Sequence, residues 1–153
     1  MTANILIVED NQTKRIEIEK AVKAALAADV VGVSSISQAY RSIEFKSWDL
    51  IILDMTFQVA QGMGQENSKE ALAGIEILQF IARKRLVTPV VVATQHSSFT
   101  SIQMPDINSI AALDELLTEL FPENYRGTIE VDLSEEAWKT NLQKAILSAL
   151  EKN

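Results

Sequence analysis

The stretch Ile5-Leu6-Ile7-Val8-Glu9-Asp10 carries most of the information about the fold, because four aliphatic residues run directly into an acidic pair. An unbroken aliphatic run is typical of a strand that is buried on both faces of a parallel sheet. Asn11 comes next and is a favourable helix cap. After it, apolar residues recur at helical spacing and form one face: Ile18, Ala21, Val22, Ala25 and Leu26. The N-terminal stretch therefore predicts a buried strand, a short turn and an amphipathic helix.

The same alternation of strand and helix recurs outward along the chain. Further strands are predicted at residues 30–33, 50–53, 90–93 and 127–131. Helical patterns follow them, with Ser37 and Ser134 as expected caps and Pro122 as an expected stop. The helix after the third strand is expected to begin near Glu70. Because parallel strands are joined by right-handed helical crossovers, this order predicts an α/β fold: a single doubly wound, five-stranded parallel sheet with helices on both faces.

Two stretches interrupt this alternation, at residues 57–70 and 95–108. The first is polar, contains glycine and has no clear period, so we expect a long loop with some local order around Phe57, Val59 and Met63. Loops of this length are unusual in a compact domain and tend to be functional.

The composition limits the classes of protein that remain. The chain has 153 residues, 47% of them hydrophobic, which suits one domain over residues 1–153 without a separate output domain. A net charge of −7 makes nucleic acid a poor partner, because phosphate binding needs a basic surface, and the basic run Arg83-Lys84-Arg85 suits a helix end. Without cysteine, thiolate metal sites and cysteine nucleophiles are excluded. No secretory signal or membrane-spanning run is recognisable, so we expect a cytoplasmic protein with no membrane partner.

Polar residues follow three of the predicted strands. Glu9 and Asp10 come directly after the first strand, Asp54 after the third and Thr94 after the fourth. In a parallel sheet the ligand site lies outside the carboxyl ends of the strands, so these side chains are expected to meet. Crowded carboxylates raise one another's pKa, and a hard cation such as Mg²⁺ relieves their repulsion. An aspartate held in this way can act as a nucleophile toward a phosphoryl group, to which the Thr94 hydroxyl can donate a hydrogen bond.

A turn residue or a helix cap is the simpler interpretation of any one acidic residue after a strand. Acidic residues after two strands, with a hydroxyl after a third, favour a functional site instead. His96, the only histidine, lies in a polar segment without other metal ligands, and we interpret it as a surface residue. Trp48 and Trp138 are expected to pack in or beside the core.

Several segments resemble the receiver domain of response regulators, the phosphoacceptor module of two-component signalling. Residues 4–11 are similar to the family's first strand with its acidic pair, residues 48–55 to its phosphoacceptor strand, and residues 73–78 to the start of its third helix. Thr94 matches the hydroxyl residue that ends its fourth strand. The resemblance covers most of residues 4–94 and implies a five-stranded parallel sheet in the receiver/flavodoxin-like order 2-1-3-4-5, with five helices.

The resemblance also implies roles for individual residues. Asp54 would accept a phosphoryl group from a histidine kinase or phosphotransfer protein, in a phosphorelay that leads to an unknown downstream protein. Asp10 and Asp54 would hold Mg²⁺ together with the backbone carbonyl of Met55, and Glu9 would act directly or through water. Thr94 would contact the phosphoryl group and help to relay the change.

The C-terminal third departs from the family pattern. Receivers carry a lysine at the end of the fifth strand, whereas Val131 stands at the best-aligned position here, and Thr128 replaces an aromatic switch residue. Thr56 stands at a position that influences how long the phosphoryl group survives in the family. Two enlarged loops, at about residues 57–70 and 97–109, lie beside the expected site.

These features lead to competing functions. The leading hypothesis is a stand-alone receiver, with no enzymatic activity beyond self-dephosphorylation, that is phosphorylated on Asp54 and signals by protein–protein interaction. The missing lysine and aromatic residue favour a second hypothesis, a phosphorylation-independent pseudo-receiver or adaptor. The third is a Mg²⁺-dependent phosphatase with Asp54 as its nucleophile. Such enzymes usually carry a second aspartate two residues later, where this chain has Thr56.

Overall fold

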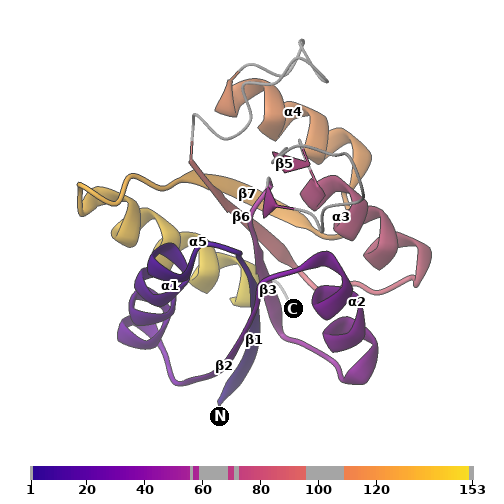
Figure 1. Ribbon diagram of the computed structural model, residues 1–153, viewed down its shortest axis with the longest axis horizontal. Helices are drawn as coiled ribbons and strands as arrows, with labels where there is room; N and C mark the ends of the chain where they lie inside the picture. The colour runs from indigo at the N-terminus through magenta and orange to yellow at the C-terminus, as the bar shows by residue number, and fades with distance from the viewer. Residues whose placement is uncertain (1, 56, 59–68, 71–72, 96–108, 152–153) are drawn as a thin grey trace.

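The computed structural model describes residues 2–55, 57–58, 69–70, 73–95 and 109–151. Strands and helices alternate along the chain (Figure 1). The strands of the main sheet are β1 (Ala3–Val8), β2 (Ala28–Val33), β3 (Leu50–Leu53), β6 (Val90–Thr94) and β7 (Tyr125–Glu130). The helices are α1 (Gln12–Ala25), α2 (Ile36–Phe45), α3 (Ala73–Arg83), α4 (Ile110–Leu120) and α5 (Ala137–Glu151). None of these described helices combines the length and the apolar character that crossing a membrane requires.

The main sheet is parallel throughout, and its topology confirms the expected one. Its strand order is β2-β1-β3-β6-β7, which reads 2-1-3-4-5 when the strands of this sheet are counted along the chain. β1 lies between β2 and β3, where the chain reverses the direction in which it adds strands. In α/β proteins the ligand site lies beside such a switch point, at the carboxyl ends of the strands.

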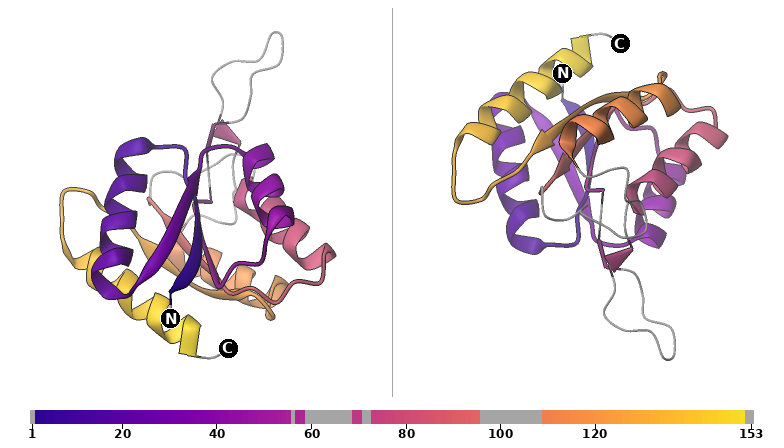
Figure 2. Two further views of the ribbon diagram at one scale, coloured as in Figure 1. Left: turned by 90° about the horizontal axis from the view of Figure 1, so that it is seen from below. Right: turned by 90° about the horizontal axis from the view of Figure 1, so that it is seen from above.

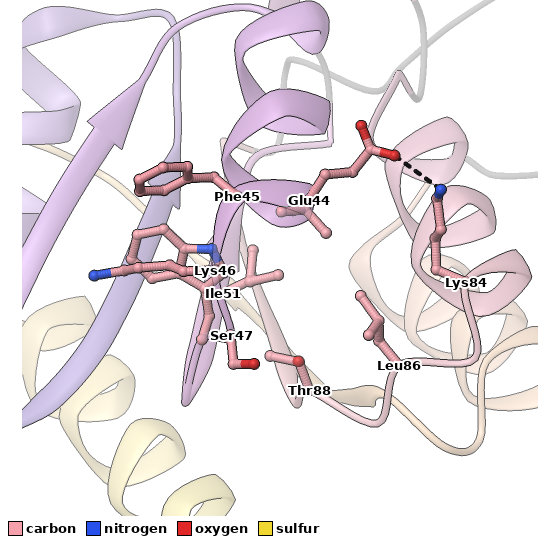
Figure 3. A pocket seen from close by; sticks show the side chains of 10 residues that line it. Glu44, Phe45, Lys46, Ser47, Ile51, Lys84, Leu86 and Thr88 are labelled. Carbon is pink, nitrogen blue, oxygen red and sulfur yellow. Dashed lines mark ion pairs between the residues drawn. The ribbon is translucent and has the colours of Figure 1, made fainter.

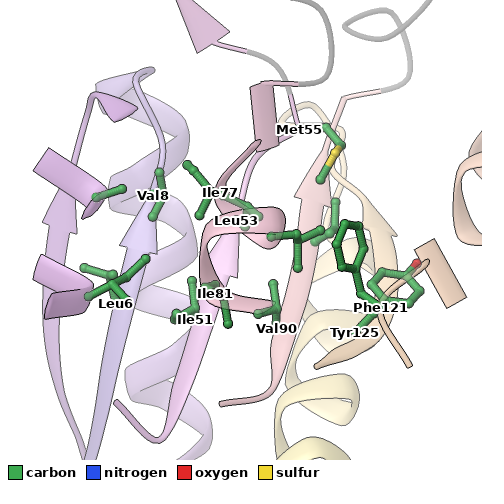
Figure 4. Close-up of a cluster of buried hydrophobic side chains, with 14 of the residues drawn as sticks. Leu6, Val8, Ile51, Leu53, Met55, Ile77, Ile81, Val90, Phe121 and Tyr125 are labelled. Carbon is green, nitrogen blue, oxygen red and sulfur yellow. The ribbon is translucent and has the colours of Figure 1, made fainter. Parts of the chain in front are cut away.

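Helices cover both faces of the sheet, as predicted. α1 and α5 pack on one face, and α2, α3 and α4 pack on the other (Figure 2). Successive residues of a strand point to opposite faces, so Ile5 and Ile7 of β1 face α1 and α5. Leu6 and Val8 face the other layer, whose buried side chains are drawn in Figure 4. Both faces of β1 are therefore buried, which explains its unbroken aliphatic run.

The starts of the first two helices depend on their caps. Asn11 caps α1 as predicted, because its side chain accepts a hydrogen bond of 2.9 Å from the backbone N–H of Lys14. The cap of α2 is Ser35 and not Ser37, since the Ser35 hydroxyl accepts the backbone N–H of Gln38 at 3.2 Å. Either serine suits a cap, and the sequence pattern alone does not distinguish them.

The last two elements begin elsewhere than predicted. β7 starts at Tyr125 instead of Gly127 and ends at Glu130. α5 starts at Ala137, and Ser134 does not cap it. The N–H and the hydroxyl of Ser134 donate instead to Oδ1 of Asp132, at 3.0 Å and 2.6 Å. This local turn competes with helix initiation and delays the start of α5.

A small antiparallel sheet lies within the first irregular stretch, where we predicted a long loop with some local order around Phe57. It pairs β4 (Phe57–Gln58) with β5 (Lys69–Glu70). Strands of two residues are too short to show a period, so the sequence pattern does not reveal them. The helix that follows, α3, begins at Ala73 instead of near Glu70. Val59 and Met63, where local order was expected, lie outside the described residues.

Candidate functional site

The register of β1 and β3 brings the predicted carboxylates together. Val8 pairs with Leu53, and the ladder continues one residue further, because Asp54 N donates to Val8 O at 3.0 Å. Glu9 follows β1 and Asp54 follows β3, so the two residues lie side by side at the carboxyl edge of the sheet. With Asp10 they form a cluster whose ligand oxygens lie within 4.8 Å of one another. This cluster, Glu9–Asp10–Asp54, is called the acidic cluster below.

The acidic cluster is largely removed from water. Glu9 is 2% exposed and Asp54 is 4% exposed. Burial and, to a smaller extent, the charge of Asp54 raise the pKa of Glu9 to about 7, although Lys14 opposes both effects. The pKa of Asp54 is also raised, first by burial and in small part by Asp10, although Lys14 and the Thr94 hydroxyl lower it. Groups with these pKa shifts are stabilised in their charged form by a nearby cation.

A buried lysine from α1 supplies a positive charge to the acidic cluster. Lys14 Nζ lies 2.7 Å from Glu9 Oε1 and 3.3 Å from Asp54 Oδ1. It also donates a hydrogen bond of 3.0 Å to the backbone carbonyl of Ala93, near the end of β6. Only 2% of the lysine is exposed, so protein atoms surround its ammonium group.

Lys14 was not among the site residues predicted from the sequence. A signal was present, because Lys14 stands four residues before Ile18 and so continues the apolar face of α1. The structure places it on that buried face, with Ile18, Ala21 and Val22. Lysine is almost never fully buried unless it is paired, so a lysine at such a position indicates an acidic partner.

Thr94 and Met55 lie at the same edge of the sheet. Thr94 ends β6 and is fully buried, and its Oγ1 has no hydrogen-bond partner of standard geometry among the described residues. Met55 directly follows Asp54, and its carbonyl accepts a hydrogen bond of 2.8 Å from Gly74 N. A carbonyl oxygen has two lone pairs, so this bond leaves one available. Thr56 lies outside the described residues.

The end of β7 shows what stands at the position aligned with the family's lysine. Val131 follows β7 and is 2% exposed. Its side chain packs in the hydrophobic cluster on the α1 and α5 face, which includes Trp138, buried as predicted. The Val131 N–H donates to Thr94 O at 2.9 Å, which extends the sheet to the edge of the site.

A bulge in β7 determines where its aromatic side chain lies. The register with β6 shifts between Tyr125 and Thr128, around Gly127, whose φ of 127° lies in a region that favours glycine. Thr128, aligned with the family's aromatic residue, forms a hydrogen bond with the Tyr125 hydroxyl. That hydroxyl also donates to Asp114 Oδ1 of α4, at 2.5 Å. Tyr125 therefore links β7 to α4.

A pocket at the opposite, amino edge of the sheet has a different character. It has a volume of about 510 Å³ and lies between the ends of α2 and α3, where Glu44 and Lys84 form an ion pair of 2.8 Å (Figure 3). Trp48, buried as predicted, and the exposed Phe45 line it. Its described lining residues include none of the predicted site residues, so the candidate chemistry lies at the carboxyl edge.

A protein-family model also matches the part of the chain that contains this site. The model of the response regulator receiver domain matches residues 5–105. The chain belongs to this family. Receiver domains are the phosphoacceptor modules of two-component signalling, where histidine kinases phosphorylate them, and they bind Mg²⁺ at an acidic pocket. The matched segment contains the acidic cluster and Thr94, whereas β7 and Val131 lie beyond it.

Two curated relatives are similar to this receiver along nearly its whole length. The Detocs response regulatory protein DtcB of Enterobacter cloacae is 25% identical over 147 residues, which cover 93% of this chain and 97% of the relative. The uncharacterized protein y4jR of Sinorhizobium fredii is also 25% identical over 147 residues, covering 94% of this chain and 96% of that protein.

Solved structures show the same fold at lower identity. The receiver domain of a putative Luxo repressor protein from Vibrio parahaemolyticus has a TM-score of 0.65 at 20% identity, covering 99% of this chain and 92% of that one. The receiver domain of RcsB from Salmonella enterica, solved with the phosphomimetic BeF3−, has a TM-score of 0.62 at 19% identity, covering 100% of this chain and 91% of that one. RcsB has also been solved bound to the promoter rprA. For this receiver, the expectation that it binds no nucleic acid rests on its net charge of −7.

Proposed function

We propose that this receiver accepts a phosphoryl group on Asp54 in a Mg²⁺-dependent reaction and signals by binding another protein. The donor is a histidine kinase or a phosphotransfer protein, and the receiver itself is a signalling domain and not an enzyme. The observation that carries the proposal is the acidic cluster, with ligand oxygens within 4.8 Å of one another beside the switch point of the sheet. In receivers this arrangement serves phosphoryl transfer to the aspartate that follows the third strand.

Asp54 acts as the nucleophile in this reaction. Its carboxylate oxygen attacks the phosphorus atom, and the bond between phosphorus and the donor's imidazole nitrogen breaks. The electron pair of that bond stays on the nitrogen, and an acyl phosphate forms on Asp54. The attacking carboxylate must be ionised, and burial opposes its ionisation, so positive charge beside Asp54 favours the reaction.

The residues at the edge of the sheet fit Mg²⁺, which prefers oxygen ligands. Asp10, Asp54 and the backbone carbonyl of Met55 would hold the ion, with Glu9 binding directly or through water. When bound, Mg²⁺ supplies the charge that offsets repulsion between the carboxylates and the incoming phosphoryl group. The buried Thr94 hydroxyl, without a standard partner among the described residues, would donate to a phosphoryl oxygen. We further propose that Thr56 influences how long the phosphoryl group survives.

Intact-mass measurement after incubation with a small phosphodonor tests this function. We expect one added phosphoryl group in the presence of Mg²⁺, none in the presence of a chelator, and none in Asp54→Asn. Asp29→Asn removes an exposed carboxylate from β2 and serves as the matched control, which should be phosphorylated like the wild type. An unmodified wild type, or an Asp54→Asn variant modified to the same extent, contradicts the proposal.

One observation favours a phosphorylation-independent adaptor as the second candidate. The Lys14 ammonium lies within ion-pair distance of Glu9 and Asp54, so the acidic cluster contains an internal cation. In this alternative the network has a structural role, and the receiver binds its partner constitutively. Partner binding that is unchanged in Asp54→Asn, together with an absent mass shift in the wild type, would support the adaptor.

A further inference from the structure

Lys14 occupies a position that α1 alone does not favour. It lies in the first turn, where its backbone N–H donates to the cap residue Asn11 at 2.9 Å. The helix dipole disfavours a positive charge near the N-terminus of a helix. Its side chain also lies on the buried face of α1, where an isolated charge is strongly unfavourable. The contacts of Lys14 with the acidic cluster offset both effects. They explain why a lysine is tolerated at this position.

The geometry of α1 directs the Lys14 side chain toward the edge of the sheet. Cα–Cβ bonds in a helix tilt toward its N-terminus, so a long side chain in the first turn reaches past the cap. The ammonium group has three protons, and three oxygens surround it: Glu9 Oε1, Asp54 Oδ1 and Ala93 O. These oxygens belong to the ends of β1, β3 and β6. The ammonium therefore lies at the centre of the carboxyl edge, in contact with the proposed phosphoacceptor.

Val131 and Lys14 lie in the same layer of the molecule. The buried neighbours of Lys14 on α1 pack in the hydrophobic cluster to which Val131 also belongs. At the position that carries a lysine in receivers, this chain therefore adds apolar volume to that layer. An ammonium group from this layer nevertheless contacts Asp54, and it belongs to Lys14 of α1. The positive charge beside Asp54 is therefore supplied by α1 in this chain, whereas in other receivers it comes from the end of the fifth strand.

We propose that Lys14 is the cation that binds a phosphoryl oxygen on Asp54, in place of the lysine that β7 lacks. This inference rests on the proposed phosphorylation of Asp54. When an Asp54 oxygen bonds to phosphorus, the negative charge moves from the carboxylate to the phosphoryl oxygens. Lys14 keeps its contacts with Glu9 and Ala93 and exchanges its 3.3 Å contact with Asp54 Oδ1 for a phosphoryl oxygen. The phosphoryl group then acts on the first turn of α1, to which the ammonium is attached.

Binding of the phosphoryl mimic BeF3− tests this role, followed by fluorine NMR at saturating Mg²⁺. Lys14→Met keeps the length of the side chain and removes its charge, so we expect a roughly tenfold or greater loss of affinity, as for a hydrogen bond to a charged group. Lys23→Met, at an exposed position on the same helix, is the matched control and should bind like the wild type. The double variant Lys14→Met/Val131→Lys should regain affinity, which a purely structural role for Lys14 does not predict.

The outcomes separate this inference from the proposed function. A wild type that takes up neither BeF3− nor a phosphoryl group contradicts the proposed function. A Lys14→Met variant that binds BeF3− as tightly as the wild type contradicts the role of Lys14 alone. If thermal melting shows that Lys14→Met is unfolded, the side-chain ammonium NMR signals of the wild type decide. BeF3− should shift the Lys14 signal and leave the Lys23 signal in place, and an unshifted Lys14 signal at saturation overturns the inference.

Discussion

The side chains of Glu9 and Lys14 form an ion pair of 2.7 Å in which each is only 2% exposed. Glu9 directly follows β1 and Lys14 lies in the first turn of α1, so the pair bridges the turn that joins them. Buried ion pairs carry a large desolvation cost, and removal of one partner leaves the other charge uncompensated. Protonation, cation binding and the position of α1 are therefore linked at this turn.

Without divalent cations, the free energy of unfolding should fall as the pH rises from about 4.5 to about 7. Burial raises the pKa of Glu9 from 4.5 to about 7, so in this range the folded protein retains a proton that the unfolded chain has released. A group whose pKa is raised by folding stabilises the folded state below its unfolded pKa, and this contribution is lost as the pH rises through the folded pKa. Urea unfolding at a series of pH values measures the effect.

Glu9→Gln is the control for this pH dependence. Other carboxylates titrate in both proteins, so the difference between their pH profiles isolates Glu9. The variant should show a flatter profile over the same range. An equal slope in both proteins would show that Glu9 is ionised throughout, and that the charge of Lys14 outweighs the effect of burial.

Lys14→Met should bind Mg²⁺ more tightly than the wild type, by at least roughly fivefold, because a neighbouring positive charge repels the ion even where water screens it strongly. The ammonium contacts the carboxylates of Glu9 and Asp54, two of the three groups that would bind the ion. Asp10→Asn and Asp54→Asn should bind Mg²⁺ more weakly, since each removes a charged ligand. Calorimetric titration measures all three, with Lys23→Met as the control. Affinity that does not change in either aspartate variant would exclude a shared metal site.

The carboxyl edge of the sheet was predictable because strand ends are visible in the sequence. The aliphatic runs that end at Val8 and Leu53 locate two strands, and parallel register then places Glu9 beside Asp54. Lys14 was not predicted, because its contact with Asp54 depends on how α1 packs and how far its side chain reaches. The spacing of Lys14 from Ile18 indicates a buried position, but only the three-dimensional structure shows which oxygens its ammonium group reaches.

Short-range features were missed for a different reason. β4 and β5 contain two residues each, which is a single period of the strand pattern and too short for a repeat to be recognised. The choice between Ser35 and Ser37 as a cap, and the turn that Ser134 forms with Asp132, depend on hydrogen bonds that differ little in energy between neighbouring positions. The sequence therefore locates elements well and their ends less well.

Gly74→Ala should destabilise the protein by roughly 1–3 kcal/mol, as expected when a side chain is forced into a packed backbone contact. A Cβ atom at Gly74 would lie 2.8 Å from the backbone oxygen of Asp54 and 2.6 Å from Met55 Cε. The Asp54 backbone belongs to the site and has little freedom to move. Gly32→Ala is the matched control, because the atoms nearest its Cβ would all belong to the flexible side chain of Arg15, with Cδ at 2.6 Å. Its effect should stay within about 0.5 kcal/mol.

Urea midpoints of the two glycine variants provide the measurement. Equal stability of Gly74→Ala and the wild type would show that α3 moves away from Asp54 at little cost. The same variant should also accept a phosphoryl group more slowly, since displacing the Asp54 backbone misplaces its carboxylate relative to Asp10.

Binding of BeF3− at Asp54 should change hydrogen exchange most in the first turn of α1 and little in β7 and α5. A bound group alters only those elements with which it interacts differently in its two states. Lys14 joins the site to α1, and the amides of Lys14 and Arg15 both donate to Asn11 at the start of this helix, each at 2.9 Å. When BeF3− binds the Lys14 ammonium, these two amides should exchange their hydrogens more slowly.

At the opposite end of the chain, Val131 after β7 reaches the site through its backbone N–H, which donates to Thr94 O, and not through a charged side chain. Val131 presents an apolar side chain to its layer, and Tyr125 is bound to Asp114 of α4 at 2.5 Å, so neither offers a charge that the new group attracts. Exchange measured by mass spectrometry on wild type and Lys14→Met, each with and without BeF3−, separates the two ends. The response of α1 should disappear in the variant even at BeF3− concentrations that saturate it. A large change confined to residues 125–146 in the wild type, with a quiet α1, would show that the signal leaves Asp54 through β7 and that Lys14 has no part in transmitting it.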